Sequence, residues 1–387
     1  MNASVILKRI AERLFGLFKI KNIILFESIP DYSGNTKRVF DEMIARGINE
    51  KYQFVWCCND MYSVNQLNER FKKFNNVKAV YRDNKFNKFY YSYVASMIIV
   101  ENMFLESRKS EQKYVFLNHG ASFKSCYGRY QLPDYCKNAR AITLSNYLME
   151  YDCYDCGFNR EYTYPIGYPR NDVLFEKPIN LHNLFNCCFD KTVYWLPTYR
   201  QHKEYDYDKH SNIDFPIIYN SDIAEQINNV ARQNNILIII KPHPVQDVSV
   251  IKDYHLSNIV FIDNDYLTSH DIDGYRLLGS VDALLTDYSS VYYDFLLCDK
   301  PIGFCWDDFE EYKQRVGFVK GLDIEYICSG GIKIYNAEDL CSFITDIAHN
   351  KDKLKEERQQ ICEVVHNHRD NLATKRVVDM IEAYLAE

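Results

Sequence analysis

The residues Ile236-Leu237-Ile238-Ile239-Ile240-Lys241-Pro242-His243-Pro244 carry the clearest structural signal in this chain of 387 residues. An uninterrupted apolar run of this kind, rich in isoleucine, is typical of a strand buried on both faces of a parallel sheet. Two prolines then remove two backbone N–H donors and fix the backbone around one imidazole. The stretch therefore predicts a buried parallel strand whose carboxyl end presents His243 beside the cation Lys241.

Similar short apolar runs alternate with helical stretches on both sides of this strand. Further strands are expected at 22–26, 52–57, 77–81, 97–101, 114–117, 141–144, 192–196, 259–262, 283–286 and 301–304. Helices are expected at 36–46, 223–234 and 290–298, with a charged helical segment at 352–385. Because strands that alternate with helices form parallel sheets covered on both faces, we expect an α/β protein. Its length predicts two doubly wound, Rossmann-like lobes with a cleft between them.

Three segments follow from this pattern: residues 1–21, a first domain at 22–180 and a second domain at 190–387 that includes the C-terminal helices. Residues 1–21 carry apolar side chains at helical spacing and several basic ones, of which Lys19 and Lys21 are the last. Such a basic amphipathic helix either lies on an anionic membrane surface or packs on the body of the first domain. Both interpretations stay open.

Composition limits the classes of function. The apolar fraction of 47% predicts packed cores, and the net charge of −7 argues against a general nucleic-acid binder. No run of about 18 apolar residues is present to span a bilayer. The 13 scattered cysteines, with no recognisable secretory signal, indicate a reduced, cytoplasmic protein.

One polar motif, Asn118-His119-Gly120-Ala121-Ser122-Phe123-Lys124, directly follows the expected strand 114–117. An imidazole on such an open turn suits proton abstraction from a hydroxyl group. Gly120 allows close backbone approach to a ligand, and Lys124 is a candidate phosphate ligand. The alternative is a histidine held only by hydrogen bonds within its loop.

A second motif, Thr286-Asp287-Tyr288-Ser289-Ser290, joins the expected strand 283–286 to the expected helix 290–298. Hydroxyl groups and unpaired N–H groups at a helix start bind anions, so a diphosphate fits there without a metal. The alternative is that Ser289 or Asp287 only caps the helix. Lys241 and His243, at the end of the strand 236–240, also suit a phosphate group. The alternative for them is a rigid turn with an exposed histidine.

Two weaker segments complete the candidate site. Pro197-Thr198-Tyr199-Arg200 places Arg200 at the end of the expected strand 192–196, and Gly167-Tyr168-Pro169-Arg170-Asn171-Asp172 forms a polar turn near the domain boundary. Each is also compatible with a plain turn. No cluster has metal-ligand spacing, and the dinucleotide-binding, P-loop and nucleophile-elbow motifs are missing from the sequence. We therefore expect no metal and no cofactor.

Taken together, these motifs resemble the CDP-glycerol:poly(glycerophosphate) glycerophosphotransferase family, which builds teichoic-acid-type and capsular polymers. The resemblance includes Phe26-Glu27-Ser28 and Ser33-Gly34-Asn35, the segments around His119, Arg170, Arg200 and His243, the serine motif, Phe295 and Asp299-Lys300-Pro301. It covers about residues 22 to 320. The chain departs from the family at Ala121-Ser122, where Thr-Pro is common, and at Arg315-Val316-Gly317-Phe318 and Ser329-Gly330-Gly331. These departures concern the identity of donor and acceptor more than the reaction type.

The resemblance implies a GT-B fold, with the acceptor on the first domain and a CDP-glycerol or CDP-ribitol donor on the second. It also implies a lipid-linked or polymeric acceptor and a peripheral location at the inner face of the cell membrane. His119 is then the general base, and His243 and Lys241 stabilise phosphate charge. Ser289, Ser290 and Thr286 hold the diphosphate, Arg200 neutralises charge and Asp287 orients the loop. Asn35, Gly120, Lys124, Arg170, Asn171 and Asp172 are further site candidates.

Two other functions remain open at this point: a GT-B glycosyltransferase that uses a nucleotide sugar, and a non-catalytic subunit of a capsule-assembly complex.

Overall fold

The computed structural model describes residues 15–102, 105, 108–125, 139–198, 215–243, 246, 248–252, 254 and 256–387. The chain divides into two compact units. The first takes the described residues within Met1–Ala121, Cys126–Asp172 and Asp370–Glu387, and the second those within Ser122–Ser125 and Val173–Arg369. The amphipathic helix predicted at 1–21 lies almost wholly outside the described residues, which begin at Phe15. In the part of the chain that is described, no helix has the length and apolar character needed to cross a membrane.

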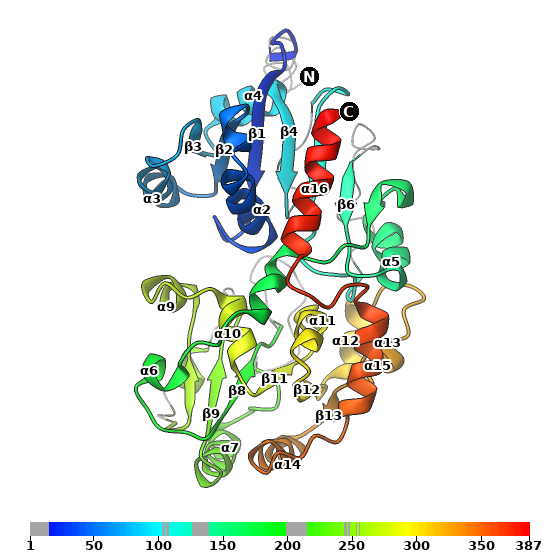
Figure 1. Cartoon of the computed structure of the whole chain (residues 1–387). Coiled ribbons are helices and arrows are strands. Elements are labelled where there is room, and N and C mark those ends of the chain that lie inside the picture. The colour runs from blue at the N-terminus through cyan, green and yellow to red at the C-terminus, as the bar shows by residue number, and fades with distance from the viewer. Residues whose placement is uncertain are drawn as a thin grey trace, which may run out of the picture. The chain divides into compact units, whose positions relative to one another are not determined.

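The first unit is built on a parallel sheet (Figure 1). Its elements in chain order are β1 (Lys21–Glu27), α2 (Gly34–Ala45), η1 (Ile48–Glu50), β2 (Gln53–Cys58), α3 (Met61–Phe71), β3 (Val77–Tyr81), α4 (Lys85–Val94), β4 (Ala95–Val100), β5 (Lys113–Phe116), β6 (Arg140–Ile142), α5 (Asn146–Cys156), η3 (Arg160–Tyr162), β7 (Thr163–Tyr164), η4 (Pro169–Phe175, which runs past the unit boundary) and α16 (Ala373–Ala386).

The described strands of this sheet lie in the order β3-β2-β1-β4-β5-β6-β7, and every pair is parallel. From β1 the chain adds β2 and then β3 on one side of the sheet. It then crosses to the other side of β1 and adds β4, β5, β6 and β7 in turn. One face is packed with aromatic rings, in which Phe26 of β1 contacts Phe40 of α2 at 5.0 Å and Phe54 of β2 at 5.0 Å between ring centroids. This burial fixes α2 on the sheet beside β1.

The last helix, α16, belongs to the first unit, which corrects the prediction of a second domain reaching residue 387. The apolar face of α16 holds Val377, Val378 and Ile381, all fully buried, and the helix contacts α2 and β5 (Figure 1). Arg46, which directly follows α2, pairs with Asp379 and Glu382 of α16, each at 2.6 Å. Helical periodicity predicted that this segment is helical, but periodicity does not say which body a helix covers.

The second unit repeats the same plan. Its elements are α6 (Leu181–Phe185), β8 (Lys191–Trp195), α7 (Ser221–Gln233), β9 (Ile236–Ile240), α8 (Ser249–Lys252), β10 (Ile259–Phe261), α9 (Asn264–Ser269), α10 (Gly274–Ser280), β11 (Ala283–Thr286), α11 (Val291–Phe295), η5 (Leu296–Cys298), β12 (Ile302–Cys305), α12 (Phe309–Arg315), α13 (Ile324–Ile327), β13 (Ile332–Ile334), α14 (Ala337–Ala348) and α15 (Lys355–Val365).

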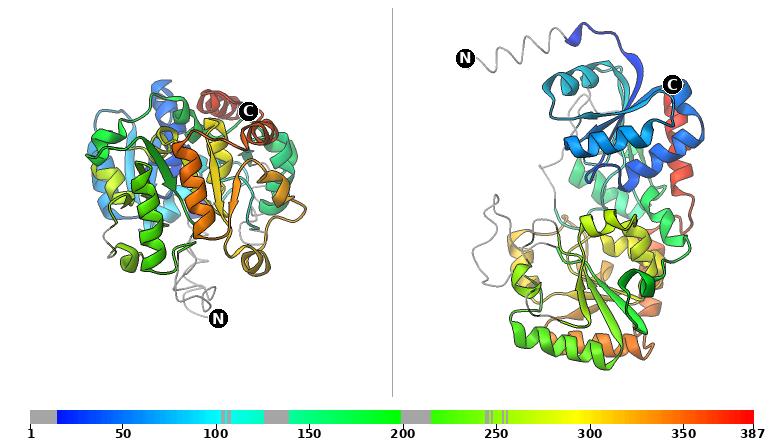
Figure 2. Two further views of the ribbon diagram at one scale, coloured as in Figure 1. Left: turned by 90° about the horizontal axis from the view of Figure 1, so that it is seen from below. Right: turned by 90° about the vertical axis from the view of Figure 1, so that its left-hand side faces the viewer.

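Its described strands form a parallel sheet in the order β10-β9-β8-β11-β12-β13. All five residues of β9 are buried, as the isoleucine run predicts. Helices α7 and α14 lie side by side over one face (Figure 2) and bury Ile227 and Phe343 against β8, β9 and β11. The Asn220 side chain accepts a hydrogen bond from Ile223 N at 2.9 Å and so caps α7. The predicted α/β class with two doubly wound parallel sheets is confirmed.

Two local predictions differ from the structure. The expected helix at 290–298 is a short α11 followed by the 3-10 helix η5, which ends where Asp299 adopts a positive φ of 47°. The segment Ser122–Ser125, expected in the first domain, belongs to the second unit. The Phe123 ring packs on Tyr293 and Phe318 at 5.7 Å from each, and Val319 N donates to Phe123 O at 3.2 Å. The packing of the Phe123 ring therefore places this segment in the second unit, although Ala121 directly before it belongs to the first.

Candidate active site

In the first unit, the polar candidates gather at the carboxyl ends of β1 and β4. The strand order reverses between these two neighbours, and such a switch point is where open α/β sheets bind ligands. The loop after β1 leads into α2, and Glu101 and Asn102 follow β4 directly. Asn102 accepts a hydrogen bond from Ile29 N at 3.0 Å, which ties the two loops together.

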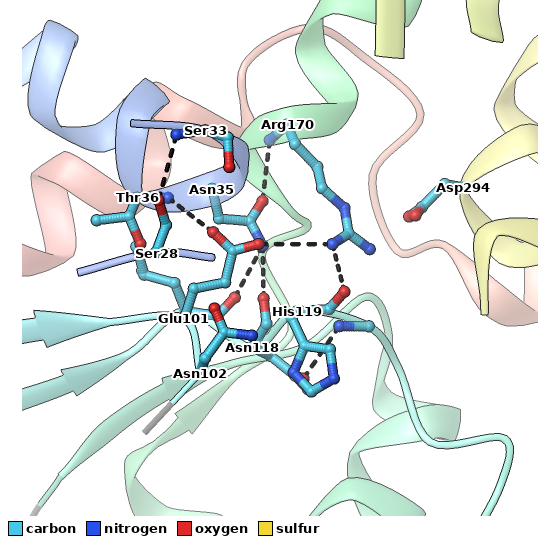
Figure 3. A network of polar contacts seen from close by, with 12 residues as sticks. Ser28, Ser33, Asn35, Thr36, Glu101, Asn102, Asn118, His119, Arg170 and Asp294 are labelled. Atoms are coloured by element: carbon cyan, nitrogen blue, oxygen red, sulfur yellow. Dashed lines mark hydrogen bonds and ion pairs between the residues drawn. The ribbon is translucent and has the colours of Figure 1, made fainter. Parts of the chain in front are cut away.

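Asn35 is the centre of a network that holds the loop carrying His119 (Figure 3). Its side-chain amide donates to Leu117 O at 3.0 Å and to Asn118 O at 2.6 Å. The side-chain oxygen of Asn35, Oδ1, accepts a hydrogen bond from Arg170 N at 3.0 Å. The Arg170 guanidinium in turn donates to the carbonyl oxygen of His119. Three successive carbonyl groups after β5 are therefore held by two side chains, both of which the sequence marked as candidates.

Glu101 completes this network and was not predicted. Its carboxylate accepts from Thr36 N at 3.3 Å, in the first turn of α2, and lies 3.8 Å from Arg170 Nη1. Burial raises the pKa of the Glu101 carboxyl from 4.5 to about 7, against the opposing effect of the Arg170 cation. Gly34 makes room for the carboxylate, because a Cβ built on Gly34 would lie 2.5 Å from both of its oxygens.

His119 itself lies on an exposed turn, as predicted. Asn118 before it adopts a positive φ of 52°, and its side-chain oxygen accepts from Gly120 N at 3.2 Å. These contacts shape the backbone on both sides of the imidazole. A solvent-accessible imidazole on a backbone held at three carbonyl groups is suited to general-base chemistry.

The candidates that follow Arg170 have structural contacts. Asn171 is buried and its N–H donates to Tyr168 O at 2.9 Å. The Asp172 carboxylate accepts from Ala373 N at 2.9 Å and from Thr374 N at 2.8 Å, so it caps the start of α16. Burial raises the pKa of Asp172. The polar turn after Gly167 thus anchors both the His119 loop and the last helix.

The second unit has an equivalent switch point between β8 and β11. Asp287, at the end of β11, is fully buried and accepts from Thr198 N, which follows β8, at 3.0 Å on each oxygen. Thr286 Oγ1 donates to Leu196 O at 2.9 Å. These bonds join the ends of the two strands. Asp287 therefore holds the end of β11 to the segment that follows β8.

Ser289 and Ser290 lie half-buried between Asp287 and α11. Ser289 Oγ accepts from Val291 N at 3.4 Å, as a capping residue does. The helix behind them has only five residues in α-conformation. Because the dipole of so short a helix is small, an anion here depends on the serine hydroxyl groups and on nearby cations.

Lys241 and His243 follow β9, the next strand beyond β8, as predicted. The Lys241 side chain is half-buried, and this burial lowers its pKa while nearby Asp263 acts in the opposite direction. His243 is exposed, and its carbonyl oxygen accepts from Gln246 N at 2.8 Å. A partly desolvated ammonium beside an exposed imidazole is a suitable partner for phosphate oxygens.

Two candidates remain outside this geometry. Arg200 lies outside the described residues. Lys124 belongs to the second unit, where it pairs with Phe318 in an antiparallel bridge. Among the described side chains, no three His, Cys, Asp or Glu residues are grouped closely enough to hold a metal ion.

Sequence reasoning missed Glu101 although the sequence held a signal. It stands at the end of the expected strand 97–101, where a charged residue closes an apolar run. In a doubly wound sheet a polar residue at that place faces the switch point. What no local pattern shows is that its carboxylate turns toward Gly34 and Arg170.

Comparison with known proteins agrees with this architecture. The chain matches the CDP-glycerol:poly(glycerophosphate) glycerophosphotransferase family over residues 9–383, and it belongs to that family. It is 25% identical over 396 residues to a teichoic acid poly(ribitol-phosphate) polymerase of Bacillus spizizenii, covering 95% of this chain and 57% of that protein. It is 28% identical over 195 residues to a teichoic acid glycerol-phosphate primase of Bacillus subtilis, covering 50% of this chain and 45% of the primase.

The solved structure of the wall teichoic acid polymerase TagF superposes with a TM-score of 0.70 at 19% identity, covering 99% of this chain and 95% of that chain. The fold is therefore GT-B-like, as the resemblance implied. The chain spans about half the length of the curated relatives it matches.

Proposed function

We propose that this protein transfers glycerol phosphate or ribitol phosphate from a CDP-polyol to a hydroxyl group of a growing cell-surface polymer. The acceptor oxygen attacks the β-phosphorus, the bond from that phosphorus to the bridging oxygen breaks, and CMP leaves with the bond electrons. The proton of the acceptor hydroxyl passes to the His119 imidazole and from there to solvent. Atoms and charge balance without a cofactor.

The observation that carries this proposal is the hydrogen-bonded clamp beneath His119. Asn35 and Arg170 hold the carbonyl groups of residues 117 to 119 and leave the imidazole exposed. A general base needs a fixed position more than a strong partner, because proton transfer requires hydrogen-bond geometry. Membership of the family, whose description names CDP-glycerol, supports the donor class.

The second unit has the groups for a diphosphate. Lys241 and His243 after β9 and the hydroxyl groups of Ser289 and Ser290 after β11 stand at the carboxyl edge of one sheet. In this proposal they stabilise the charge that grows on the phosphate oxygens. Asp287 keeps its structural task of holding the β8 and β11 loops together. Arg200 is proposed to neutralise further negative charge.

The acceptor is proposed to be lipid-linked or polymeric, which places the protein at the inner face of the membrane. Leu17 is 81% exposed and Phe18 is 44% exposed, with Lys19 exposed beside them. Apolar side chains next to a cation favour contact with an anionic bilayer surface. Sedimentation with vesicles of anionic or neutral phospholipid tests this part, and equal partition to both would contradict it.

Product identification tests the reaction itself. Purified protein is incubated with CDP-glycerol, CDP-ribitol and sugar nucleotides side by side, each with a lipid-linked acceptor, and the products are identified by mass. CMP release with growth of the acceptor by one polyol phosphate supports the proposal. Release of a nucleoside diphosphate indicates glycosyl transfer, and no turnover with any donor indicates an assembly subunit.

The general base is tested separately. We expect His119→Ala to lower turnover by at least about 100-fold in a folded protein. A folded His119→Ala protein with near-normal turnover removes His119 from this role. His243→Ala is expected to lose both rate and donor affinity, because His243 is proposed to contact the phosphate groups of the donor.

A further inference from the structure

The proposed reaction uses no group from the buried acidic side chain at the centre of the first switch point. Glu101 is 5% exposed, although burying a carboxylate costs free energy unless it is paired and hydrogen-bonded. The chain accommodates it with a glycine at Gly34, where any side chain would collide with the carboxylate. Burial of the Glu101 carboxylate at this free-energy cost requires a physical explanation.

The contacts of Glu101 lead to His119 in two steps. The carboxylate lies 3.8 Å from Arg170 Nη1, and the same nitrogen donates to the carbonyl oxygen of His119 (Figure 3). Arg170 N also donates to Asn35, whose amide holds Leu117 O and Asn118 O. Arg170 therefore holds the His119 loop in two ways. It does so directly through its hydrogen bond to His119 O, and indirectly through its hydrogen bond to Asn35.

We propose that Glu101 is a positioning residue for His119, acting through Arg170 to fix the backbone that carries the imidazole. The proposal rests on the proposed function in that His119 is taken as the general base. A guanidinium has five donors in a rigid plane, so a nearby carboxylate selects one orientation of the group. With that orientation fixed, the bond to His119 O is directed, and the imidazole stays within the small range that proton transfer tolerates.

A purely structural role makes a different prediction. Thr36 N donates to the Glu101 carboxylate at 3.3 Å, so Glu101 also satisfies an N–H group at the start of α2. If this were its whole function, Glu101→Gln would be nearly silent, because the amide oxygen accepts the same bond. The charge toward Arg170 is what the amide lacks.

The kinetic test uses Glu101→Gln at about pH 8, where the carboxylate of the wild type is charged. We expect kcat to fall roughly 10 to 100-fold, as for a small misplacement of a catalytic group, with KM for the CDP-polyol unchanged. In a His119→Ala background the same substitution should cause little further loss, because residues that act as one unit are not additive. Glu69→Gln is the matched control, since Glu69 is an exposed glutamate that pairs with Lys72 on α3.

A spectroscopic test is independent of turnover. Histidine is labelled selectively, and the ring signal of His119 is assigned by its loss in His119→Ala. We expect Glu101→Gln to shift or broaden that signal, and Glu69→Gln to leave it unchanged. Circular dichroism confirms that each variant is folded. Arg170→Lys, which keeps a cation but loses the planar donor group, should disturb the His119 signal as Glu101→Gln does.

The outcomes separate the two proposals. If the wild type releases no CMP from any CDP-polyol, the proposed function is wrong, and the His119 ring signal still decides whether Glu101 positions it. If Glu101→Gln leaves both kcat and that signal at wild-type values, the positioning role is wrong. It is also wrong if the loss of kcat remains undiminished when His119 is already alanine.

Discussion

At the level of single residues, Gly34 is tightly constrained by its backbone conformation and by a neighbouring carboxylate. It adopts a φ of +62°, and an added Cβ would lie 2.5 Å from both carboxylate oxygens of Glu101. We expect Gly34→Ala to lower the free energy of unfolding by about 2 to 4 kcal/mol, from backbone strain and displacement of the buried carboxylate. Chemical denaturation measures this loss in the free energy of unfolding.

Gly47 provides the matched control for this substitution. It adopts a similar φ of +72°, but the nearest atom to an added Cβ is 3.7 Å away. Gly47→Ala should therefore cost only the backbone strain, about 1 kcal/mol. Equal losses in the two variants would show that the contact with Glu101 has no energetic weight.

The ionisation of Glu101 gives a second prediction at this scale. Its pKa is about 7 in the folded protein, above the ordinary value of 4.5. The charged group that faces it is the Arg170 guanidinium, and backbone N–H groups at the start of α2 donate hydrogen bonds to it. The folded state then binds the proton more tightly than the unfolded state. The stabilisation from this group is complete below about pH 4.5 and is lost as pH rises to about 7.

Glu101→Gln removes that dependence. Between pH 4.5 and 7 the free energy of unfolding of the wild type should fall relative to this variant, by a total on the order of 2 kcal/mol. Denaturant midpoints measured across this range for both proteins test the sign. A difference that is flat, or that favours the wild type as pH rises, would contradict the burial of a protonated carboxyl group.

Helices and strands show which features the sequence predicts well. The bounds of β3, β9 and β11 agree with the predicted ranges. Both β9 and β11 are apolar runs buried in a parallel sheet, whereas β3 is a mostly half-buried strand at the edge of its sheet. β7 and β13 have two and three residues, too few for a periodic signal. The contacts of Glu101 and the place of α16 could not be predicted for one reason: both depend on residues far away in the chain, which local pattern does not contain.

Asp172 gives a prediction at the level of a helix. It caps α16 from outside, because the residue before that helix, Leu372, has no side chain that can do so. We expect Asp172→Ala to lower the free energy of unfolding by about 1 to 2 kcal/mol through loss of two hydrogen bonds to a carboxylate at a helix start. Hydrogen exchange should rise first in the peptides of α16.

Asp60→Ala is a suitable comparison, since Asp60 caps α3 through Ser63 N at 2.8 Å on the exposed surface. It should raise exchange in α3 and leave α16 unchanged. If Asp172→Ala raises exchange evenly over the whole first unit, the carboxylate is not acting as a local cap.

On the scale of the whole molecule, the two units are built to the same plan and carry their polar clusters at equivalent places. In the described part of each sheet the strand order reverses between the third and fourth strands, β1 and β4 in one and β8 and β11 in the other. In each, a buried carboxylate, Glu101 or Asp287, lies at that reversal. One architectural rule therefore positions the polar cluster of each unit, although no motif is shared between the two clusters.

The C-terminal segment links the stability of the first unit to the end of the chain. Val377, Val378 and Ile381 are fully buried and Tyr384 is 8% exposed. At about 1.5 to 3 kcal/mol for each buried apolar side chain, α16 contributes an amount comparable to the whole stability of a typical domain. Arg140 of β6 adds a contact to Glu387 at 2.9 Å.

Deleting residues 373–387 should therefore unfold the first unit and leave the second folded, although the deleted residues follow the second unit in sequence. Hydrogen exchange read by peptide should show loss of protection in β1, β4 and β5, with protection retained in β9 and β11, whose neighbours are all in the second unit. Lys375→Ala, at an exposed position on α16, should leave both sheets protected. Equal loss of protection in both sheets would mean that the units fold as one, and unchanged protection of β5 would mean that α16 contributes little to the first core.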